Sequence, residues 1–153
     1  MGKAGDAVLI LMAEDDPEDV MLARDALHEA KLINPLVAVE DGQQLMDYLH
    51  RTGAFAPPHP AVRPGIILLD LKMPKKDGRE VLAEIRSDPA LRDIPVVVLT
   101  TSKAEEDVLR SYSLGANSFI VKPVSFDGLV DVMRSIDEYW FELVRLPTHL
   151  GAA

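Results

Sequence analysis

Residues 8–16 read VLILMAEDD, six apolar residues followed directly by three acids. A continuous apolar run of this length predicts a strand that is buried on both faces, as in parallel sheets. Three later runs are also apolar and also end in a polar residue, namely Asp70 after 66–69, Thr100 after 96–99 and Lys122 after 119–121. Because ligands bind beyond the carboxyl ends of parallel strands, the acids, the hydroxyl and the ammonium should meet at one edge of a sheet.

The rest of the chain alternates between expected strands and expected helices. We predict strands at 8–13, 36–39, 66–69, 96–100 and 118–121. Helices are expected from Pro17 behind an Asp16 N-cap, after Asp41-Gly42, around 81–85, at about 104–114 and from about 125 to 144. This alternation predicts a doubly wound, flavodoxin-like α/β fold, a three-layer sandwich around a parallel five-stranded sheet of order 2-1-3-4-5.

The domain organisation follows from the absence of internal boundaries in the sequence. No repeat, low-complexity tract or linker divides the chain. We therefore expect a single domain over residues 1–153, with a core at about 7–145 and a short C-terminal tail at 146–153. Residues 51–64 contain four prolines and predict an irregular loop before the third strand.

The composition argues against several kinds of protein. The formal net charge of -9 argues against direct binding of nucleic acid, because phosphate contacts supply much of that affinity. There is no cysteine, so disulfides, thiolate metal ligands and cysteine catalysis are excluded. No apolar run approaches the ~18 residues of a membrane span, and the N-terminus lacks the pattern of a signal peptide. We therefore expect a globular, cytoplasmic protein that does not enter a membrane.

Three acids at the expected sheet edge are candidates for a metal site. Helix capping explains Asp16, but it does not explain Glu14 and Asp15, which would repel one another at the strand end unless a cation lies between them. Asp70 either caps the third strand or is paired or metal-bound, since an isolated carboxylate is costly to bury. The first and third strands should be neighbours, so Asp15 and Asp70 could share a hard ion such as Mg²⁺. Asp70 could also act as a nucleophile toward phosphorus.

Thr100 and Lys122 are unremarkable when each is taken alone. Threonine is a common strand former, and a Lys-Pro pair is usually part of a loop. At one edge with Asp70, however, they would supply a hydroxyl donor and a positive charge for the oxygens of a phosphoryl group. The combination favours a phosphoryl-transfer site, while the purely structural roles remain open alternatives.

Taken together, these motifs resemble the receiver domains of two-component response regulators over about residues 7–145. The resemblance rests on Glu14-Asp15-Asp16, on Asp70 with Met73-Pro74 and Asp77-Gly78, on Thr100, on Gly115-Ala116 and on Lys122-Pro123. It implies that a sensor histidine kinase donates a phosphoryl group to this chain, and that the product is a change of conformation. A protein of this kind is not classed as an enzyme.

The resemblance also assigns roles to individual residues. It implies that Asp70 is the phosphoacceptor and that Mg²⁺ is held by Asp70, by Asp15 directly and by Glu14 through water. The backbone carbonyl of Lys72 would be a further metal ligand.

Three more residues receive roles in the same way. The Thr100 hydroxyl and the Lys122 ammonium would bind the phosphoryl group. Phe119 matches the position of the aromatic switch residue, which would couple phosphorylation to a change of the protein surface.

A narrower resemblance concerns the partner. Residues 13–19, 97–102, 137–140 and 146–147, together with the loop at 51–64, are similar to the single-domain regulators that serve bacterial phytochromes. This implies a phytochrome-type histidine kinase as the donor. The wide apolar stripe of the last expected helix further suggests a homodimer through the face formed by the fourth helix, the fifth strand and the last helix.

Two rival interpretations fit the sequence less well. An aspartyl-phosphate phosphatase would also carry a strand-end aspartate, but it usually has a second aspartate two residues later, where this chain has Lys72. A receiver-like protein that only binds partners would be expected to have lost an acid, the threonine or the lysine, and all of these are present here.

Overall fold

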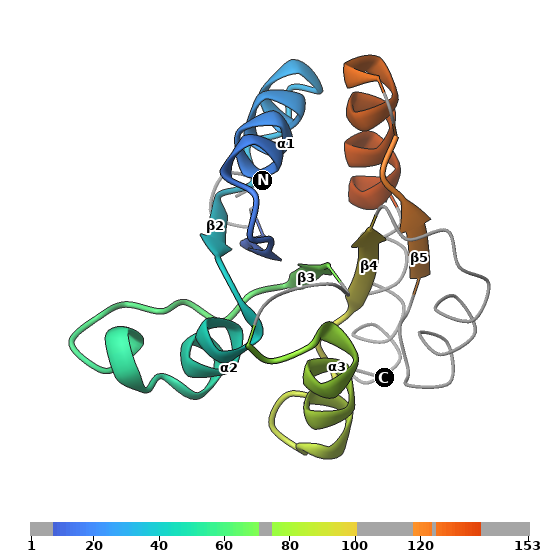
Figure 1. Cartoon of the computed structure of the whole chain (residues 1–153). Helices are drawn as coiled ribbons and strands as arrows, with labels where there is room; N and C mark the ends of the chain where they lie inside the picture. The colour runs from blue at the N-terminus through green and yellow to red at the C-terminus, as the bar shows by residue number, and fades with distance from the viewer. Residues whose placement is uncertain (1–7, 71–74, 101–117, 124, 139–153) are drawn as a thin grey trace, which may run out of the picture.

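The computed structural model describes residues 8–70, 75–100, 118–123 and 125–138. Five strands form one parallel sheet in the order β2-β1-β3-β4-β5 (Figure 1), which confirms the predicted order. The strands are β1 Ile10–Ala13, β2 Leu36–Val39, β3 Ile66–Leu69, β4 Val96–Thr100 and β5 Ser118–Val121. The first strand begins two residues later than predicted, and the bounds of the other four strands match the prediction.

Helices cover both faces of the sheet, giving the three predicted layers (Figure 1). The labelled helices are α1 Pro17–Glu29, α2 Gly42–His50 and α3 Gly78–Ser87. A further helix spans 126–138 and is called the C-terminal helix below. α1 and the C-terminal helix lie on one face, and α2 and α3 lie on the other. The helix expected at 104–114 and the part of the last helix after 138 lie outside the described residues.

Short polar caps begin the helices directly after the strands. Asp16 caps α1 by accepting a hydrogen bond of 2.9 Å from the Glu18 backbone N–H, with Pro17 at the first helical position. Asp41 caps α2 by accepting from the Gln44 N–H at 2.8 Å. The predicted Asp16 cap is confirmed, and the Asp41 cap is found where the sequence placed only a turn into the helix. Because each strand passes into its helix through a tight connection, the strand-end acids are held at a fixed place.

The core consists of two layers because successive strand residues point to opposite faces of the sheet. Leu11 and Ala13 pack toward α2 and α3, whereas Ile10 and Met12 pack toward α1 and the C-terminal helix. All four residues of β1 and all four residues of β3 are buried. This burial on both faces is the reason that these strands read as continuous apolar runs.

The C-terminal helix contributes part of its predicted apolar stripe to the core. Val130, Met133 and Ile136 are buried in the cluster on the α1 side of the sheet. Phe126 belongs to the same stripe but is 39 % exposed. Val132 also packs partly buried against that cluster. Periodicity gives the direction of an apolar face, but not the length of sheet that lies beneath it.

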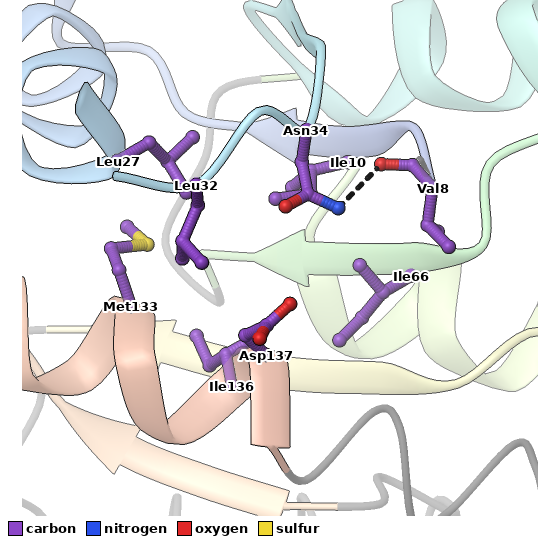
Figure 2. A pocket seen from close by; sticks show the side chains of 9 residues that line it. All are labelled: Val8, Ile10, Leu27, Leu32, Asn34, Ile66, Met133, Ile136 and Asp137. Atoms are coloured by element: carbon purple, nitrogen blue, oxygen red, sulfur yellow. Dashed lines mark hydrogen bonds between the residues drawn. The ribbon is translucent and has the colours of Figure 1, made fainter. Parts of the chain in front are cut away.

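The edge of the sheet at the amino ends of the strands is closed by apolar side chains (Figure 2). Here Ile10 and Ile66 face Met133 and Ile136 across a small crevice. Asn34 lies beside it and donates a hydrogen bond of 3.0 Å from Nδ2 to the Val8 carbonyl. We call this region the amino edge.

Within the described ranges, none of the helices has both the length and the apolar character needed to cross a bilayer.

Candidate phosphoryl-transfer site

Register brings two buried carboxylates together at the carboxyl ends of β1 and β3. Ala13 is paired with Leu69, so the next residues, Glu14 and Asp70, are neighbours. The Asp70 backbone N–H donates to the Ala13 carbonyl at 3.1 Å, which fixes the two strand ends relative to each other. Glu14 is only 3 % exposed and Asp70 only 8 % exposed. We call this region the carboxyl edge.

Asp15 adds a third carboxylate to the carboxyl edge. One oxygen each from Glu14, Asp15 and Asp70 can be chosen so that all three lie within 4.8 Å of one another. Asp15 is exposed, whereas the other two are buried, so the group is open to solvent on one side. Three carboxylate oxygens in such a cluster fit a hard divalent cation, which prefers oxygen ligands and retains water. The predicted convergence of these acids is thus observed.

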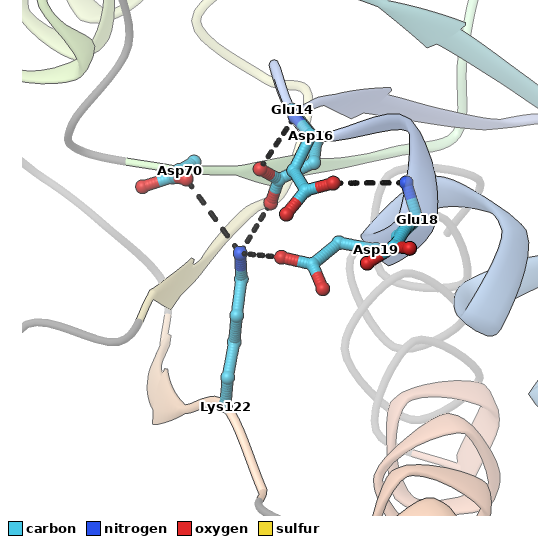
Figure 3. A network of polar contacts seen from close by, with 6 residues as sticks. All are labelled: Glu14, Asp16, Glu18, Asp19, Asp70 and Lys122. Carbon is cyan, nitrogen blue, oxygen red and sulfur yellow. Dashed lines mark hydrogen bonds and ion pairs between the residues drawn. The ribbon is translucent and has the colours of Figure 1, made fainter.

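Lys122 reaches this group from the segment after β5 (Figure 3). Its Nζ donates to Glu14 Oε1 in a short, charge-assisted contact and lies 3.6 Å from Asp70 Oδ2. It also donates to Asp19 Oδ2 at 3.0 Å. Only 13 % of the Lys122 side chain is exposed. The ammonium therefore carries the positive charge that makes burial of these carboxylates tolerable.

Burial and pairing act on the protonation of Glu14 and Lys122 in different ways. Burial raises the pKa of the Glu14 carboxyl to about 7, although its hydrogen bond with Lys122 opposes this. Burial by itself would lower the pKa of Lys122, but hydrogen bonds to Glu14 and Asp19 raise it above its usual value. Lys122 thus remains charged at neutral pH.

Of the other predicted site residues, two are placed by the pairing of their strands and one lies outside the described residues. Thr100 is the last residue of β4, and its Cα is paired with that of Val121, which directly precedes Lys122. Phe119 lies in β5 and is paired with Val98. Lys72, whose carbonyl was expected to be a metal ligand, lies outside the described residues.

The described end of the loop after Asp70 is anchored to the start of α2. Lys75 Nζ lies 3.5 Å from the buried carboxylate of Asp41. Gly42 approaches Lys76 so closely that a Cβ at Gly42 would overlap the Lys76 carbonyl oxygen. This close approach holds residues 75–78 at the carboxyl edge.

Asp19 is the member of the network that the sequence did not assign to the site. The sequence indicates for it only a place in the first turn of α1, where acids favour the helix N-terminus. A signal was available, because Asp19 is the third residue of the helix that begins directly after the strand-end acids. Its distance from Lys122 in sequence, however, concealed their contact.

The chain belongs to the response regulator receiver domain family, whose model matches residues 10–134. Receivers are phosphorylation-dependent signalling domains, and this chain is one of them. Among curated proteins it is similar to Response regulator Rcp1 of Synechocystis sp., at 42 % identity over 139 residues, covering 91 % of this chain and 92 % of Rcp1.

Two solved structures extend the comparison. The phosphorylated cyanobacterial phytochrome response regulator RcpA superposes with a TM-score of 0.79 at 44 % identity, over 88 % of this chain and 94 % of RcpA. The Mn²⁺-bound form of Rcp1 superposes with a TM-score of 0.78 at 41 % identity, over 88 % of this chain and 95 % of Rcp1. One related receiver thus carries phosphate and another carries a divalent metal ion.

Proposed function

We propose that this receiver accepts a phosphoryl group on Asp70 from the phosphohistidine of a sensor kinase. In this step an Asp70 oxygen forms a bond to phosphorus while the phosphorus–nitrogen bond breaks. The histidine nitrogen leaves with the bonding electron pair and takes up a proton. The observation that carries the proposal is the buried Asp70 carboxylate beside two further acids and 3.6 Å from an ammonium. Phosphoryl transfer to a carboxylate needs a positioned nucleophile and positive charge for the phosphoryl oxygens.

The donor set supports Mg²⁺ as the metal of this site. Glu14, Asp15 and Asp70 would hold it, with the Lys72 carbonyl as a further ligand by family resemblance. When bound, Mg²⁺ supplies positive charge that lowers the repulsion between Asp70 and the incoming phosphoryl oxygens. Lys122 would donate to a phosphoryl oxygen from the β5 side, and Thr100 would donate its hydroxyl from the end of β4.

We also propose a partner and an output for this receiver. Similarity to RcpA, a cyanobacterial phytochrome response regulator, favours a bacterial phytochrome kinase as the donor. We propose that residues 1–153 act in the cytoplasm as one receiver domain with a core at about 7–145 and a tail at 146–153. Its product would be an altered binding surface, not a turned-over substrate, and it would bind no nucleic acid directly.

The proposed switch runs from Thr100 to Phe119. Thr100 would move toward the phosphoryl group, and Phe119 would turn into the space that it leaves. This would change the face formed by the expected helix 104–114, β5 and the C-terminal helix, through which a homodimer would form. Val121 on β5 is 40 % exposed and Phe126 is 39 % exposed, so this part of the chain offers apolar surface to a partner.

Phosphorylation of Asp70→Asn tests the proposed nucleophile. Wild type incubated with acetyl phosphate and Mg²⁺, or with a phosphorylated phytochrome kinase, should gain one phosphate that hydroxylamine removes. Asp70→Asn should gain none, while the exposed control Asp25→Asn on α1 should match wild type. Intact-protein mass spectrometry measures the result. Phosphate on Asp70→Asn at the wild-type rate would refute the assignment.

A second experiment tests the metal. Millimolar Mg²⁺ should raise the melting temperature of wild type, because a ligand of the folded state stabilises it by about 2.7 kcal/mol at 100 times its Kd. Asp15→Asn should lose most of this shift. An unchanged melting curve of wild type would count against the metal site.

A third experiment tests the switch. Analytical ultracentrifugation with and without beryllofluoride, a phosphoryl mimic, should show increased self-association of wild type. Thr100→Ala should still be phosphorylated but should not respond in self-association. An equal response of both proteins would show that the switch uses another element.

A further inference from the structure

Asp19 differs from the other two carboxylates that contact Lys122. Glu14 and Asp70 belong to the group of acids proposed to hold the metal, whereas Asp19 projects from the first turn of α1 and is not part of that group. Lys122 is therefore shared between two candidate metal ligands and one carboxylate from the first turn of α1 that is not a candidate ligand (Figure 3). The inference below rests on the proposed function of this site.

Sharing an ammonium between these acids creates a competition once a divalent cation is bound. Glu14 and Asp70 would turn their oxygens toward the cation. The positive charge of the cation would then repel the Lys122 ammonium from its present place. Lys122 would then keep its pairing with Asp19, which lies at 3.0 Å. Without Asp19 the ammonium would have to stay on the metal ligands or leave the site.

The surroundings of the Asp19–Lys122 pair favour such a role. A crevice around the pair is lined by apolar side chains from the sheet, from α1, and from the segment and helix that follow β5. These are Met12, Leu22, Ala23, Leu99, Pro123 and Leu129. A low local dielectric strengthens an ion pair relative to one in open water. The Asp19 side chain is 34 % exposed and that of Lys122 is 13 % exposed, so solvent reaches the pair mainly through Asp19.

We propose that Asp19 is a positioning residue that holds the Lys122 ammonium beside Asp70 while Glu14 and Asp70 bind a divalent cation. Asp19 thereby separates the two positive charges of the site and allows both to serve the same phosphoryl group. The alternative is that Asp19 only favours the N-terminus of α1, as an acid in a first helical turn does.

Mg²⁺ affinity in a double-mutant cycle distinguishes the two roles. Asp19→Asn should weaken Mg²⁺ binding roughly tenfold, the scale of changes seen when residues behind metal ligands are altered. In the Lys122→Met background the same substitution should change the affinity less than about threefold, because the competing ammonium is gone. Isothermal titration calorimetry with Mg²⁺ alone measures all four proteins.

Two further variants serve as controls. Asp25→Asn removes the same charge from an exposed site on α1 and should leave Mg²⁺ affinity within about twofold of wild type, since exposed charges far from a site are screened. Asp19→Glu retains the carboxylate and should restore most of the affinity. A helix-terminus role would predict a loss of stability in Asp19→Asn without the dependence on Lys122.

The outcomes separate this inference from the proposed function. If Asp19→Asn behaves like Asp25→Asn, or if its loss of Mg²⁺ affinity persists undiminished without Lys122, the positioning role is wrong although the site remains. If wild type binds no Mg²⁺ and accepts no phosphate, the proposed function and the positioning role both fail.

Discussion

The two edges of the sheet are built on the same strands but treat polar groups in opposite ways. At the carboxyl edge, β1 and β3 end in the buried acids Glu14 and Asp70, and Lys122 compensates their charge. At the amino edge, the same strands begin among apolar side chains, and Asn34 beside them is neutral and hydrogen-bonded (Figure 2). Asp137 also lines the crevice there, but it is exposed to solvent and not buried as Glu14 and Asp70 are. Burial of charge lowers stability unless it is compensated, so the carboxyl edge is adapted to chemistry and the amino edge to stability.

The largest effect on stability is expected from removing the compensating charge. Lys122→Met should lower the free energy of unfolding by about 3–5 kcal/mol at pH 8, because loss of one partner leaves the other buried and unpaired. The exposed control Arg134→Met should cost far less. Urea denaturation measures both, and Mg²⁺ should recover part of the loss in Lys122→Met. A loss below about 1 kcal/mol, the value typical of exposed pairs, would mean that the carboxyl edge does not depend on this ammonium.

A core substitution at the amino edge should affect stability alone. Met133 is 1 % exposed, and Met133→Ala should destabilise the fold by about 3 kcal/mol through lost burial and a cavity. Phosphorylation of Asp70 should keep its wild-type rate at a temperature where the variant is folded. A changed rate would show that the two edges are coupled through the C-terminal helix.

The pH dependence of stability should show the effect of burying the Glu14 carboxyl at the carboxyl edge. Burial raises the pKa of Glu14 from 4.5 to about 7, so the folded state holds this proton more tightly than the unfolded state. The stabilising contribution of this group is then full below about pH 4.5 and is lost as the pH rises toward 7. Between these limits wild type should lose up to about 1.4 kcal/mol per pH unit relative to Glu14→Gln. Parallel stability curves of the two proteins would contradict a raised pKa.

The smallest effect is expected for Asn34, the neutral polar residue of the amino edge. Asn34→Ala removes a single neutral hydrogen bond to the Val8 carbonyl and should cost about 1 kcal/mol. Mg²⁺ affinity and phosphorylation should not change. A loss comparable to that of Lys122→Met would show that neutral and charged groups contribute alike, which would remove the contrast between the edges.

The sheet and the convergence of Glu14, Asp15 and Asp70 could be predicted because they follow from local sequence. Apolar runs mark buried strands, and the residue after each run must lie at the same edge of a parallel sheet. The contact of Lys122 with Asp19 could not be predicted in this way. It depends on how α1 sits over the sheet, which no spacing along the chain encodes.

The last helix shows a second limit of sequence reasoning. Its apolar period predicted the buried face with Val130 and Met133, but it also included Phe126, which remains 39 % exposed. A period of about 3.6 residues gives the direction in which the apolar side chains point around the helix axis. It does not give the part of the helix that lies over the sheet.

Gly42 has a consequence for how freely this molecule can vary. Its missing side chain is the space that the Lys76 carbonyl occupies, so a methyl group there would act as a wedge between α2 and the loop that follows Asp70. A larger side chain at position 42, at the start of α2, would thus displace the rim of the phosphoryl-transfer site. The geometry of that rim therefore depends on the missing Cβ of Gly42, a residue that carries no charge.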